Sequence, residues 1–158
     1  MVYLLILQNS GLSLERTWQM EFYRCATAVL PSKCFISPDV GSTLGVKGGL
    51  ADFYVNSTLQ WIVEVLREGS DMNKHYERFI KGPYKQISSK DWILVDFRAE
   101  SKDINRHPYA KMIHVCYNEN FTKAVVKRCA KLPGCSRESF QTIASIGFNG
   151  GKLEMASL

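Results

Sequence analysis

Several common sequence patterns are missing from this chain. Its five cysteines form no Cys-x-x-Cys pair and no cysteine–histidine spacing suited to zinc, so neither a disulfide framework nor a zinc finger is predicted. No apolar run approaches the ~20 residues of a membrane span. The opening MVYLLILQNSG has no basic segment and no cleavage site, which argues against a signal peptide. The glycine-rich residues 41–49 lack the ending of a phosphate-binding loop. We therefore expect a reduced, intracellular protein.

The composition indicates one globular domain. The 158 residues are 46% hydrophobic and 22% charged, which is typical of a globular protein. This length suffices for one hydrophobic core and is short for two domains with a core each. The net charge of +5 fits an anionic partner such as nucleic acid, although many domains without such a partner are equally basic. We expect the domain to cover residues 1–132. Residues 133–158 show no sustained periodicity, so we expect a loose tail there.

The hydrophobic periodicity predicts an α/β fold. Helical spacing of apolar residues predicts a helix within residues 12–33 and a second one at 71–80. Strands are predicted at residues 33–40 (ending at Ser37-Pro38), 50–55, 59–66, 91–98 and 111–117, and a closing helix at 121–132. The order of helix, three strands, helix and strand is typical of a mixed sheet flanked by helices.

Two acidic residues interrupt the predicted hairpin. Asp52 lies in LADFYV and Glu64 in WIVEVL. With a turn at residues 56–58, Asp52 faces Ile62, and strand alternation places both acids diagonally on one face. A buried unpaired carboxylate is costly, and a divalent cation between two would relieve both charges, which predicts a Mg²⁺ or Mn²⁺ site. The alternative is an Asp52 beside a turn and an outward-facing Glu64 on a one-sided strand.

A set of short motifs resembles a known family. The motifs are ERTWQMEFYR, GGLADFYV, WIVEVLREG, HYERF, GPY and WILVDFR, within residues 14–117. With the αβββαβ order, they resemble the nuclease-like C-terminal domain of Crinkler-type effector proteins, which belongs to the PD-(D/E)XK, restriction-endonuclease-like superfamily. Such domains occur in fungi and oomycetes, commonly after an NTPase module. The resemblance implies a restriction-endonuclease-like core, DNA as a partner, an NTPase module in a longer parent protein and a nuclear location.

The resemblance also implies roles for individual residues. Asp52 and Glu64 would hold the metal that activates the attacking water, and Glu21 would be an auxiliary acid from the first helix. The usual lysine position is Leu66, and the neighbouring Arg67 can bind phosphate but cannot act as a base. His75 and Arg78 lie three apart on the second predicted helix and could face phosphate or solvent. The residues expected to contact nucleic acid are Lys47, Arg67, Lys74, His75, Arg78, Lys81 and Lys85.

Two functions remain open. The first is metal-dependent hydrolysis of DNA phosphodiester bonds, with Glu21, Asp52, Glu64 and Arg67 as the catalytic residues. In that case, replacing Glu64 is expected to abolish cleavage and leave the fold intact. The second is a non-cleaving nucleic-acid-binding or protein-interaction module that retains the nuclease fold. The acids favour the first function, and the missing lysine favours the second.

Overall fold

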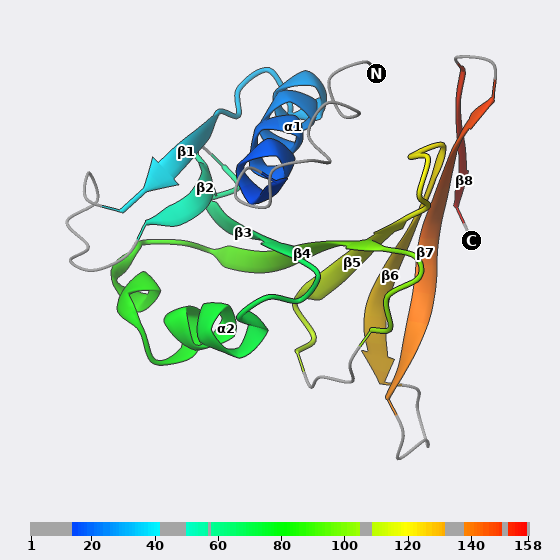
Figure 1. Cartoon of the computed structure of the whole chain (residues 1–158). Helices are drawn as coiled ribbons and strands as arrows, with labels where there is room; N and C mark the ends of the chain where they lie inside the picture. The colour runs from blue at the N-terminus through cyan, green and yellow to red at the C-terminus, as the bar shows by residue number, and fades with distance from the viewer. Residues whose placement is uncertain are drawn as a thin grey trace.

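One mixed sheet organises the molecule (Figure 1). The computed structural model describes residues 14–41, 50–56, 58–104, 109–131, 138–149 and 152–157. Its eight strands follow one another in the order β1 to β8, and two α-helices, α1 (Leu14–Val29) and α2 (Met72–Ile80), accompany them. The predicted α/β class is confirmed. No helix in these described ranges is long and apolar enough to cross a membrane.

The first three strands form an antiparallel meander. They are β1 (Ile36–Val40), β2 (Ala51–Val55) and β3 (Trp61–Arg67). Ser37 and Pro38 lie inside β1 rather than at its predicted end. Proline is tolerated there because β1 is the edge strand of the sheet and an edge strand does not need every amide for pairing.

A helical crossover then makes the next strands parallel. The chain leaves β3, forms α2 and the short 3₁₀-helix η3 (Pro83–Gln86), and returns as β4 (Asp91–Ala99) beside β3. β5 (Met112–Tyr117) is parallel to β4. Parallel neighbours require a crossover of this kind. The observed order α1-β1-β2-β3-α2-β4 is the αβββαβ order predicted from the sequence.

The last three strands correct two predictions. Residues 121–132 were expected to contain a helix, and the chain instead forms β6 (Lys123–Lys131). The expected loose tail contains β7 (Glu138–Asn149) and β8 (Lys152–Ser157). A register irregularity between Val126 and Lys127 breaks the alternation that would have indicated a strand. The sheet therefore continues beyond the predicted domain boundary at residue 132.

The two helices cover opposite faces of the sheet (Figure 1). α1 packs Trp18 and Phe22 against a cluster that includes Val63 and Val65. α2 and η3 contribute Phe79 and Tyr84 to a second cluster with Ile62 and Leu66. Since side chains alternate along a strand, Glu64 faces the second cluster, on the side of α2.

Candidate functional site

The two predicted acids lie where β2 and β3 separate. Backbone pairing between these strands extends as far as Phe53 and Val63, and one residue further Asp52 comes opposite Glu64 rather than Ile62. Here the backbone amide of Asp52 donates to Glu64 Oε1 (3.2 Å), and the amide of Val65 donates to Asp52 Oδ2 (2.7 Å). Beyond the last paired residues of β2 and β3, the two carboxylates thus accept the hydrogen bonds of the backbone amides that carbonyl oxygens accept within the sheet.

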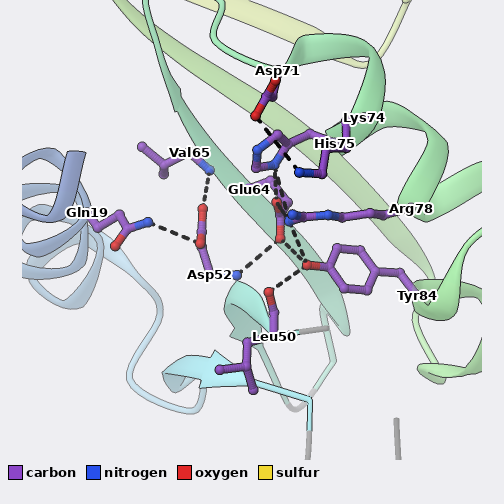
Figure 2. A network of polar contacts seen from close by, with 10 residues as sticks. All are labelled: Gln19, Leu50, Asp52, Glu64, Val65, Asp71, Lys74, His75, Arg78 and Tyr84. Carbon is purple, nitrogen blue, oxygen red and sulfur yellow. Dashed lines mark hydrogen bonds and ion pairs between the residues drawn. The ribbon is translucent and has the colours of Figure 1, made fainter. Parts of the chain in front are cut away.

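Glu64 is fully buried and surrounded by hydrogen-bond donors (Figure 2). Its Oε2 accepts from His75 Nδ1 at 2.6 Å and from Arg78 Nη1 at 3.2 Å. Its Oε1, already bonded to the Asp52 amide, lies 2.8 Å from the hydroxyl of Tyr84. That hydroxyl is also 2.6 Å from the carbonyl oxygen of Leu50, so its single hydrogen serves one of the two acceptors. Both oxygens of Glu64 therefore have protein donors.

Local structure explains why these donors converge. His75 and Arg78 are three residues apart on α2, so they share one face of the helix. A Cβ atom on Gly82 would lie 2.6 Å from the Cα of Arg78, and glycine therefore allows the chain to turn closely over the end of α2. Pro83 begins η3 directly afterwards, and this turn places Tyr84 beneath the helix beside Glu64.

The electrostatics of the cluster favour a paired carboxylate. Burial and the neighbouring Glu64 raise the pKa of Tyr84 far above its ordinary value, so Tyr84 remains a donor. Burial alone would lower the pKa of Arg78, but Tyr84 and Glu64 more than offset this and raise it, so Arg78 remains cationic. The side chains of His75 and Arg78 are 13% and 29% exposed. They are the part of the cluster that solvent can reach.

Asp52 is bound to α1 by Gln19, a residue that was not among the predicted site residues. Gln19 Nε2 donates to Asp52 Oδ1 at 3.1 Å. The predicted auxiliary acid, Glu21, instead forms a surface ion pair with Arg24 at 2.8 Å. One feature of the sequence could have indicated this role for Gln19: it lies three residues before Phe22, on the apolar side of the predicted helix. In the structure Gln19 is buried.

The remaining predicted cations that the structure describes make other contacts than those with the two acids or are exposed. Arg67 is beside Tyr117, whose pKa burial and Glu68 raise to about 12 while Arg67 opposes the rise. The side chains of Lys74 and Lys81 are 70% and 77% exposed and lie 4.0 Å and 3.7 Å from the carboxylates of neighbouring acids. Lys85 is exposed on η3, and Lys47 lies outside the described residues. Of the predicted nucleic-acid contacts that the structure describes, His75 and Arg78 are the two that reach Glu64.

The arrangement of donors does not fit a metal ion. Both oxygens of Asp52 and both of Glu64 accept hydrogen bonds from the protein, and the cationic Arg78 lies beside Glu64. Mg²⁺ requires near-octahedral oxygen ligands, so at Glu64, where each oxygen lies within hydrogen-bond distance of two protein groups, one of these groups would have to leave first. In the described part of the chain, no group of three or more histidine, cysteine, aspartate or glutamate residues could hold a metal ion.

A second buried acid supports the start of α2. Asp96 Oδ2 accepts from Arg98 Nε at 2.6 Å and His114 Nδ1 at 2.8 Å, and its Oδ1 accepts from the amide of Gly69 at 2.8 Å. Burial works to raise the pKa of Asp96, but these hydrogen bonds and the charge of Arg98 hold it below its ordinary value. Asp96 therefore anchors the turn between β3 and α2.

The exposed edge of the site is cationic and its interior is anionic. Arg78 keeps several N–H donors in a planar arrangement that suits phosphate, and Glu64 holds the side chain in place.

Comparison with known proteins gives no relative: no family model matches the chain, and no curated protein or solved structure matches it significantly. The chemistry of the site is therefore argued from its geometry.

Proposed function

We propose that this chain is a nucleic-acid-binding module on a restriction-endonuclease-like core, in which the two strand acids serve the structure. The observation that carries the proposal is Glu64, fully buried with donors on both oxygens. The position of the usual lysine is Leu66, which is buried in the core. A site with no lysine and with its carboxylates bound by the protein is better suited to holding the fold together than to activating water.

A basic stripe on α2 supports nucleic acid as the ligand. Lys74 and Arg78 are four residues apart and lie along one side of α2; Lys81 follows as its C-cap residue, and Lys85 continues the series on η3. The acids beside Lys74 and Lys81 form exposed pairs at long distance, and such pairs hold lysine weakly. The two lysines can therefore exchange these partners for phosphates, while Glu64 fixes Arg78 between them.

The test is binding of a DNA duplex in EDTA. Replacing Lys74 and Lys81 together by glutamine should weaken binding regardless of sequence. A matched variant removes two exposed lysines elsewhere, Lys33 and Lys102, and should bind like the wild type. Equal losses in both variants would mean that only net charge matters, and the role of α2 would be wrong.

Metal-dependent hydrolysis of DNA is the second candidate function. It is favoured by one observation, the contact between the Asp52 amide and Glu64, which makes the two acids neighbours. A plasmid-nicking assay with Mg²⁺, Mn²⁺ or EDTA separates the two functions. Nicking that requires the metal and is lost in Glu64→Gln would favour the nuclease; binding without nicking would favour the module.

A further inference from the structure

A cavity of about 270 Å³ lies at the amino-terminal ends of the parallel strands. It is bounded by the first residues of β3, β4 and β5 and by side chains of β6 and β7. None of the residues that contact Glu64 lines it. Its walls include Trp61, Trp92, Ile113, Ile143, Lys111 and Arg128.

The shape and lining of the cavity suit one planar ring system. Its volume falls just below the range of about 300–1,000 Å³ that drug-sized ligands occupy. Trp61 is 43% exposed although it is large and apolar, whereas Trp92 is held from within by stacking on Phe79 at 4.3 Å. A half-exposed tryptophan on an apolar wall is a stacking surface for an aromatic base.

The charges at the rim suit an anion attached to that ring. Lys111 lies over the ring of Trp92, 5.2 Å from its centroid, and forms an ion pair with Asp91. Arg128 is exposed, and its Nη2 donates to Gln141 at 3.3 Å, a contact with a neutral residue. Among the described residues that line the cavity, these two cations accompany one acid, Asp91, which leaves a positive charge on the rim.

We propose that this cavity binds a nucleotide, with the base stacked on Trp61 and the phosphate at Arg128. If the cavity binds one base of a single strand, this proposal rests on the proposed nucleic-acid binding. If the cavity binds a free nucleotide, the proposal is independent of that function. Both ligands present an aromatic base that carries a phosphate. Comparing the binding of a mononucleotide with that of an oligonucleotide decides which of the two the cavity binds.

The experiment titrates the whole chain with adenosine, AMP and a short oligodeoxyadenylate, using calorimetry and tryptophan fluorescence. AMP should bind saturably and quench the fluorescence because the base covers Trp61. Trp61→Ala should weaken binding about tenfold. Trp61→Phe should keep most of the affinity measured by calorimetry and lose most of the quenching.

Arg128→Gln should weaken the binding of AMP several-fold and leave the binding of adenosine unchanged. Phe35→Ala, which removes another exposed aromatic side chain, should bind like the wild type.

The outcomes separate this site from the proposed function. Absence of saturable AMP binding at millimolar concentration, or equal AMP affinity in wild type and Trp61→Ala, would overturn the cavity as a nucleotide site. If the oligonucleotide still binds and only the α2 lysine variant loses it, the cavity proposal fails and the proposed function stands. If AMP binds at Trp61 and no oligonucleotide or duplex binds, the cavity stands for free nucleotides and the proposed function fails.

Discussion

At the scale of single residues, the main result is how the protein accommodates a buried charge. An isolated carboxylate in an apolar interior would give up its charge or destabilise the fold. At Glu64, four groups offset the cost of burial by binding the carboxylate: Arg78, His75, Tyr84 and a backbone amide. Removing such an acid leaves Arg78 partly buried without its partner, so the expectation that replacement of Glu64 spares the fold no longer follows.

Glu64→Ala should therefore lower the free energy of unfolding by about 3–5 kcal/mol, the usual effect of removing one partner of a buried ion pair. Tyr84→Phe should cost about 1 kcal/mol, the value of one hydrogen bond. Urea denaturation followed by circular dichroism measures both. Glu21→Ala is the control, because that acid pairs at the surface and should change stability by less than about 0.5 kcal/mol. A Glu64→Ala protein as stable as the wild type would show that the acid is not structural.

Asp96 makes stability depend on acid pH. Its folded pKa lies below the ordinary value of 3.8, so its contribution is complete above that value and is lost as the pH falls through the lower, folded pKa. The free energy of unfolding should therefore decline as the pH falls below about 3.8, and Asp96→Asn should make that decline shallower. Urea denaturation at a series of pH values checks this. Parallel profiles for the two proteins would show that Asp96 does not carry the effect.

At the scale of elements, helix α2 decides what the strand acids can do. Its pattern predicted a helix at residues 71–80, and the structure has it at Met72–Ile80. The sequence left open whether His75 and Arg78 face phosphate or solvent, because a helical pattern gives the face but not the element packed against it. The crossover from β3 to β4 lays that face on Glu64. The sequence therefore marked His75, Arg78 and Glu64 separately, but it did not predict the contacts between them.

The turn before α2 depends on Gly69. This residue has φ +68°, and a Cβ atom there would lie 2.7 Å from Arg98 Nη2. Gly69→Ala should lower the free energy of unfolding by at least about 1–2 kcal/mol, because the left-handed conformation is strained for alanine and Arg98 must also move. Ser70→Ala is a neighbouring control without that constraint. Thermal denaturation of both variants checks the prediction, and equal melting temperatures would contradict it.

At the scale of the whole molecule, the sequence predicted the first half of the fold better than the second. In the meander and the crossover, the apolar residues follow regular strand and helix periods. The predicted strand ends there differ from the observed ones by a few residues. β6 was missed because its pattern is broken at Val126 and Lys127, and pairing with strands on both sides overrides local preference. The contact of Asp52 with Gln19 was missed because it joins residues 33 apart in the chain.

The net charge of +5 and the α2 stripe together predict how binding depends on salt. Each phosphate contact releases counterions, so the logarithm of the DNA affinity should fall by about 0.9 per contact for each unit of log salt. Replacing Lys74 and Lys81 should reduce the magnitude of that slope by about 1.8. Fluorescence anisotropy over a series of salt concentrations measures it. A slope unchanged by the double replacement would place the phosphate contacts elsewhere.

The most direct test of the account is a titration of the protein with metal alone. Because protein donors bind the oxygens of Asp52 and Glu64, calorimetry with Mg²⁺ and electron paramagnetic resonance with Mn²⁺ should detect no saturable site that depends on these acids. Asp52→Asn and Glu64→Gln should then give the same titration as the wild type. One saturable metal ion in the wild type that disappears in both variants would contradict the account and restore the acids as metal ligands.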